Sequence, residues 1–178
     1  MNEQNYRSYL FLISVFLLYI CCSCVQQKRI SLGVNKASRT TFIAKKADSK
    51  RPNSSIYVLD ADSNRYKIKQ GQKVLNDVRV KLNGGKTVVH EIIREVLGPK
   101  IAEFQKTMVV FIVRIYPDFD GNVLGVDFLI GKDVNMSAKE LEQISRKIKE
   151  REGFYVPEDI DRRYRLTPIG LRVNFNKL

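Results

Sequence analysis

The placement of cysteine constrains the fold of this chain more than any other feature. Its three cysteines, Cys21, Cys22 and Cys24, lie close together, and none occurs in the rest of the 178 residues. A disulfide framework and a thiolate zinc site are therefore excluded for the body of the chain. The only histidine, His90, leaves little scope for histidine-based metal or triad chemistry. The body must fold around a hydrophobic core, for which a 44% share of hydrophobic residues is sufficient.

An apolar run precedes the cysteines. It extends from Leu10 to Ile20, which is 11 residues, and follows a polar start that carries Glu3 and Arg7. A membrane-spanning helix needs about 20 apolar residues, whereas the apolar part of a secretory signal needs roughly 7–15. The run therefore predicts a signal peptide over residues 1–23 and export from the cytoplasm.

The end of this run resembles the bacterial lipobox, in which a small residue precedes a cysteine that is lipidated and becomes the new N-terminus. Ser23 before Cys24 fits the pattern best, Cys21 before Cys22 fits second, and Cys21 itself follows the bulky Ile20. The resemblance implies an envelope lipoprotein held in a membrane by acyl chains on Cys24. A cleaved soluble protein and an uncleaved anchor are the alternatives.

Residues 24–55 are expected to form a flexible, basic tether. Their apolar residues are sparse and without periodicity, and Pro52 begins a closing loop, so the segment is not expected to fold alone. The tether either docks on anionic lipid or polymer or is a solvated linker. No acidic residue occurs between Cys24 and Asp48, which favours a domain that faces the periplasm over one displayed at the cell surface.

Residues 56–178 are predicted to form one α+β domain. Alternating or apolar segments predict strands, and apolar residues at helical spacing predict a helix over 87–105 that Pro99 kinks or divides. A second helix begins at Ser137, where Glu140 completes a capping box. The expected strands are 56–59, 65–69, 78–82, 108–116, 124–130 and 169–175. This order predicts an antiparallel sheet with both helices packed on one face, a two-layer sandwich.

The chain from Thr107 onward resembles the C-terminal domain of the TonB family. The resemblance rests on a strand, an Asp-Gly turn, a second strand, a helix, an aromatic residue before proline and a closing strand. The matching segments are 110–113, 120–123, 141–148, Phe154 to Pro157, and 170–175. The resemblance implies a two-layer fold that binds protein at an exposed sheet edge. An energy-transducing role is not expected, because the long proline-rich span of that family is missing.

No catalytic, metal or cofactor site is predicted. His90 lacks a second histidine four residues later and is expected at the boundary of a helix stripe. Asp118, Asp120 and Asn122 alternate as calcium ligands do, but Gly121 comes too early for an EF-hand loop, so a hairpin turn is expected. The segment that begins at Asp60 is interpreted as a turn in the same way; it comprises Asp60, Asp62 and Asn64.

A net charge of +12 indicates an acidic partner. Nucleic acid is not expected, because the chain is predicted to be exported and carries no nucleic-acid motif. The candidate basic interaction face comprises Lys28, Arg29, Lys45, Lys46, Arg162, Arg163, Arg165 and Arg172. The favoured hypothesis is a non-enzymatic envelope lipoprotein that binds a protein or an anionic envelope component. The alternatives are an inhibitor or accessory subunit of an envelope enzyme or transporter, and a hydrolase that uses carboxylates.

Overall fold

The computed structural model describes residues 28–47, 55–106, 110–131 and 134–178, so the predicted signal peptide and Cys24 lie outside the described residues. Within these ranges the α-helices are α2 (Gly85–Lys106) and α3 (Ala138–Arg151), with short 3-10 turns η1 (Ala61–Arg65) and η2 (Phe175–Lys177). The strands are β1 (Gly33–Lys36), β2 (Thr41–Lys46), β3 (Ser55–Asp60), β4 (Val74–Leu75), β5 (Lys81–Leu82), β6 (Phe111–Pro117), β7 (Val123–Gly131), β8 (Phe154–Tyr155), β9 (Arg165–Leu166) and β10 (Ile169–Arg172).

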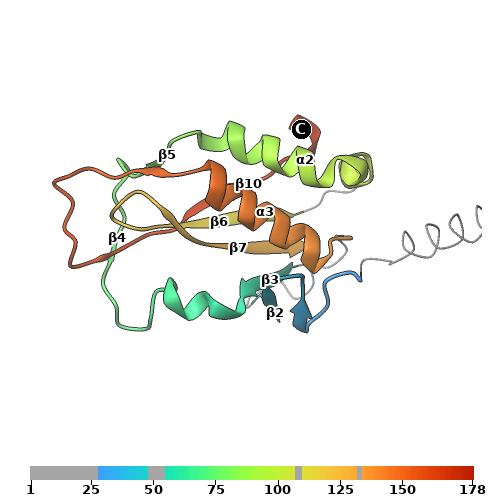
Figure 1. Cartoon of the computed structure of the whole chain (residues 1–178), viewed down its shortest axis with the longest axis horizontal. Coiled ribbons are helices and arrows are strands. Elements are labelled where there is room, and N and C mark those ends of the chain that lie inside the picture. The colour runs from blue at the N-terminus through green and yellow to red at the C-terminus, as the bar shows by residue number, and fades with distance from the viewer. Residues whose placement is uncertain (1–27, 48–54, 107–109, 132–133) are drawn as a thin grey trace, which may run out of the picture.

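Six strands form one antiparallel sheet in the order β1-β2-β3-β7-β6-β10, and α2 and α3 pack together over one of its faces (Figure 1). The register explains this, because Val58 pairs with Phe128 and Phe128 pairs with Val113, so inward-facing residues of three strands line up. These side chains are fully buried against the apolar stripes of the two helices. The predicted α+β sandwich with an antiparallel sheet and both helices on one face is confirmed.

Part of the predicted tether belongs to the domain. Phe42 and Ala44 of β2 are buried on the helix-covered face, and Ile30 is buried too. The expectation of a flexible tether over residues 24–55 is therefore wrong for residues 30–46, and the domain begins well before the predicted boundary at residue 56. A strand in a half-buried sheet needs an apolar residue only at every second position, so two such residues suffice. A count of apolar residues over the whole segment misses so short a strand.

Two of the smaller predicted strands are wrong. In the segment 65–69, Arg65 ends η1 and the next four residues form a turn and irregular chain. Of 78–82 only Lys81 and Leu82 form a strand, β5, which pairs with β8 outside the main sheet. Val78 is 82% exposed. Tyr66 does not join a strand but packs on the sheet from outside, with its ring over Gly125 of β7. Alternation of apolar residues over three to five positions is too short a signal to separate a strand from a loop that lies against a sheet.

The helix predictions hold with one difference. The Ser137 hydroxyl and the Glu140 carboxylate form the expected capping box at the start of α3. The helix α2 runs unbroken from Gly85 to Lys106 with Pro99 inside it, so the alternative of two short helices is wrong. Proline in a helix interior costs about 3 kcal/mol. Buried residues on both sides of it, including Leu97 and Phe104, provide the packing that outweighs this cost.

Candidate anion-binding groove

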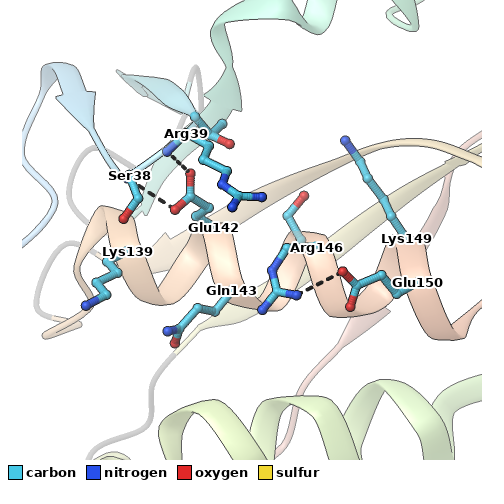
Figure 2. A pocket seen from close by; sticks show the side chains of 10 residues that line it. Ser38, Arg39, Lys139, Glu142, Gln143, Arg146, Lys149 and Glu150 are labelled. Atoms are coloured by element: carbon cyan, nitrogen blue, oxygen red, sulfur yellow. Dashed lines mark hydrogen bonds and ion pairs between the residues drawn. The ribbon is translucent and has the colours of Figure 1, made fainter.

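A groove of about 600 Å³ lies between α3 and the turn that joins β1 to β2 (Figure 2). The turn contributes Ser38, Arg39 and Thr40. The helix contributes polar side chains at helical spacing, because positions separated by three or four residues share one face. These side chains are Lys139, Glu142, Gln143, Arg146, Lys149 and Glu150. The apolar stripe of α3 packs on the sheet, so the opposite, charged face forms one wall of the groove.

Glu142 fixes the turn against the helix. Its carboxylate accepts hydrogen bonds from the backbone N–H groups of Ser38, at 3.1 Å, and of Arg39, at 2.6 Å. Partial burial raises the pKa of this carboxyl, but the backbone N–H donors outweigh that effect and hold the pKa below its usual range. Glu142 is therefore ionised at neutral pH and already has its hydrogen-bond donors.

The groove carries an excess of positive charge. Four of its side chains are cationic and two are carboxylates. Glu150 is paired with Arg146 at 2.9 Å, and Glu142 is bound by the turn. Within the described ranges, none of the ion pairs uses Arg39, Lys139 or Lys149, all of which are exposed. This arrangement can attract an anion such as a phosphate ester.

A second polar arrangement lies on the other face of the sheet, which neither helix covers. Asp127 is 0% exposed and accepts hydrogen bonds from the hydroxyls of Tyr66, at 3.1 Å, and Tyr116, at 2.8 Å, and from Arg114 at 3.2 Å. We call these four residues the Asp127 cluster. Burial raises the pKa of both phenols, so each stays a proton donor. The tyrosines and the arginine satisfy the buried carboxylate, which identifies the cluster as a packing element.

Part of the Asp127 cluster could have been predicted from the sequence, although the alternation of residues in the strand argues against it. Asp127 alternates with apolar residues, so the pattern indicates an outward-facing, hydrated side chain. The hairpin register, however, places Arg114 directly opposite Asp127, and such opposite charges indicate a cross-strand pair. The contribution of Tyr66 was not predictable, because it depends on where the segment after η1 lies.

The predicted basic interaction face is not one surface. Lys45 and Arg172 point to the helix-free face, but β3, β7 and β6 lie between their strands, a separation of about 19 Å. Lys46 follows Lys45 on the strand and points to the opposite face. Arg163 pairs with its neighbour Asp161 at 2.7 Å. The remaining members are dispersed as follows: Arg162 reaches Asp120, Arg165 lies in β9, and Lys28 and Arg29 lie where the described chain begins.

The other candidate residues have structural surroundings. His90 is half-buried on α2, where burial and the cations Lys86 and Arg94 lower its pKa, in agreement with the predicted boundary position. Asp118 accepts hydrogen bonds from the backbone of Asp120 and Asn122, which confirms a hairpin turn. In the same way, Asp60 caps η1 through the N–H of Asp62. Across the described residues, no group of three potential metal ligands is close enough to hold an ion.

Neither described helix combines the length and the apolar character that crossing a membrane requires. Comparison with known protein families, with curated proteins and with solved structures found no match. The lipobox and TonB-like resemblances therefore stay predictions, and a function is inferred from the groove and from the sequence.

Proposed function

We propose that this chain is a non-enzymatic envelope lipoprotein, anchored through Cys24, whose domain binds a phosphate-bearing envelope component in the groove. The observation that carries the binding role is the set of three exposed cations, Arg39, Lys139 and Lys149, that have no carboxylate partner in the described part of the chain. The groove carboxylates are held by other groups and, in the described part of the chain, form no ion pair with these cations, so four cations stand against two carboxylates. A multivalent anion would supply the missing counter-charge.

The anchor is tested by mass spectrometry of the mature protein. We expect the N-terminal peptide to begin at Cys24 and to carry a diacylglyceryl group, and Cys24→Ala to abolish this modification. A thiol is required for the thioether bond, so alanine cannot replace it. Lipid on Cys22 would move the anchor by two residues, and recovery of an intact Met1 would contradict the proposed export.

The groove is tested by neutralising its three unpaired cations. We expect the triple variant Arg39→Gln, Lys139→Gln, Lys149→Gln to bind polyphosphate at least about tenfold more weakly than the wild type in 0.15 M salt. Each removed cation deletes an attraction to the polymer, and each tenfold loss corresponds to about 1.4 kcal/mol. The full chain in non-ionic detergent is titrated with fluorescent polyphosphate, and the affinity is measured by anisotropy.

A matched variant controls for net charge. Lys69, Lys81 and Lys177 are exposed and lie outside the groove. Their replacement by glutamine removes the same charge, and we expect it to weaken binding less than about threefold, since only long-range attraction is lost. Equal losses in the two triple variants would mean that the groove is not the binding site.

A further inference from the structure

The chain enters the domain at one end of the groove. Arg29 forms an isolated β-bridge with Ser137, and the Ile30 N–H donates to the Met136 carbonyl over 2.7 Å. Ile30 is only 5% exposed, so this entry point is held by packing as well as by hydrogen bonds. Ser137 is the N-cap of α3, and Lys139, the first groove cation on the helix, follows two residues later.

The entry point limits the distance between the anchor and the groove. Arg29 is the fifth residue after Cys24, so five Cα–Cα steps separate the two along the chain. Even fully extended, these steps span at most about 18 Å. A flexible tether over all of residues 24–55 would have a root-mean-square span of about 30 Å. The presence of β1 and β2 in the sheet therefore brings the domain much closer to the membrane.

This distance matters because the field of an anionic membrane is short-ranged. At physiological salt the field falls off over a Debye length of about 8 Å. The short connection keeps the Ser137 end of α3 within roughly two such lengths of the headgroups. From Lys139 to Lys149 the helix rises only about 15 Å, so the whole groove can lie along the membrane. A 30 Å tether would leave it beyond the field for most of the time.

We propose that the groove docks on anionic phospholipid headgroups of the same leaflet that holds the Cys24 lipid. The inference rests on the proposed anchor and groove, and it names the source of the phosphate. Headgroups compete favourably with soluble polymers, because the anchor holds them at a high effective concentration. The cations Arg39, Lys139 and Lys149 face them without carboxylate partners among the described residues, and exposed Lys28 adds charge at the entry end.

The test measures the distance from the groove to the bilayer surface. The lipidated chain, purified from membranes, carries a fluorophore either at Gln143→Cys in the groove or at Asn176→Cys in η2, which follows β10, the strand at the opposite edge of the sheet, and packs against α2 (Figure 2 shows Gln143). It is reconstituted in vesicles of phosphatidylcholine alone or with 30% phosphatidylglycerol, each containing a headgroup spin-labelled quencher. We expect strong quenching only at position 143, only in anionic vesicles, and reversed by 0.5 M salt. Equal quenching at the two positions, or quenching independent of lipid charge, would overturn the proposal.

Two variants sharpen the result. Neutralising Arg39, Lys139 and Lys149 should reduce the docked-to-undocked ratio by about 100-fold, since each cation near an anionic surface contributes about a fivefold preference. Inserting a flexible segment of about 25 residues between Gln27 and Lys28 should lower quenching at position 143 severalfold, while polyphosphate binding in detergent stays unchanged. Unchanged quenching in either variant contradicts docking by the groove in the anchored chain.

The outcomes separate this inference from the proposed function. Groove-dependent polyphosphate binding without charge-dependent quenching leaves the binding role intact and refutes membrane docking. Loss of both refutes the groove as an anion site. A mature chain without lipid on Cys24 or Cys22 removes the anchor, and with it the geometric basis of docking.

Discussion

Replacing Asp127 with alanine is expected to lower the free energy of unfolding by about 3 kcal/mol, the largest loss that we expect from any single polar side chain. The carboxylate is 0% exposed and is the common acceptor for two tyrosine hydroxyls and one guanidinium. Alanine leaves all three donors without their acceptor in a site that water reaches poorly. The loss is placed at the lower end for a buried ion pair, because the Arg114 side chain is 29% exposed and can be partly hydrated.

The Asp127 cluster also holds a loop on the sheet. The Tyr66 ring lies over Gly125, where any added Cβ would collide with the ring. The centroids of the Tyr66 and Tyr116 rings are 4.7 Å apart. On the other side, Arg114 stacks over the Tyr57 ring at 4.9 Å. Without Asp127, the hydroxyl end of Tyr66 loses its partner and the segment after η1 loses its polar attachment. Faster local hydrogen exchange around Tyr66 should therefore accompany the global loss.

Asp127→Asn is the matched control. Its amide oxygen can accept from Tyr116 and Arg114, and its NH2 can donate to the Tyr66 oxygen, so we expect a loss of only about 1 kcal/mol. Urea unfolding of the three proteins at pH 7 measures both differences. An alanine variant as stable as the asparagine variant would contradict the assigned role of the carboxylate.

Comparison of the wild type with Asp127→Asn also reports the ionisation of the Asp127 carboxyl. Burial raises the pKa of this carboxyl in the folded chain, although the Tyr116 hydroxyl and Arg114 oppose the shift. The folded state therefore binds the proton more readily than the unfolded state. The stability of the wild type relative to Asp127→Asn must rise as the pH falls from neutral through the folded pKa towards the unfolded value near 3.8. A relative stability that decreases as the pH is lowered would mean that the folded cluster lowers this pKa.

The features that the sequence predicts correctly depend on neighbouring residues. The capping box joins Ser137 to Glu140 within one turn, and the β6–β7 hairpin follows from two apolar strands around an Asp-Gly turn. What could not be predicted depends on residues that are distant in sequence. The strand β2 has only Phe42 and Ala44 facing the core, and it is stable because β3 lies beside it.

The groove also combines features that depend on neighbouring residues with features that depend on residues distant in the sequence. The charged face of α3 is readable from the spacing of Lys139, Gln143 and Arg146. Counting cations predicts a basic protein, but it does not reveal which cations lack partners. Glu142 accepts hydrogen bonds from the backbone N–H groups of Ser38 and Arg39, more than a hundred residues earlier, and so forms no ion pair with a groove cation among the described residues. A count of cations also placed Arg163 in the predicted basic interaction face, although this side chain forms an ion pair with Asp161, two residues earlier in the sequence.

Gly121→Ala is expected to lower the free energy of unfolding by about 3 kcal/mol, for two reasons that can be separated. Gly121 has a φ of +85°, a left-handed conformation that costs other residues about 1 kcal/mol. In addition, a Cβ at this position would lie 2.6 Å from the carbonyl oxygen of Phe154, which is backbone and cannot rotate away. The Phe154 N–H donates to the Gly121 carbonyl over 2.7 Å, so a shift of the turn would also break the contact between the hairpin and β8.

Gly71→Ala isolates the first reason from the second. Gly71 has nearly the same φ, +81°, but a Cβ added there would have no neighbour within 4 Å. We expect this variant to lose only about 1 kcal/mol, the conformational part. The difference between the two variants in urea unfolding then measures the close approach of the turn to β8. Equal losses would mean that the hairpin turn and β8 can move apart at no cost, so that their contact would add nothing to the stability of the domain.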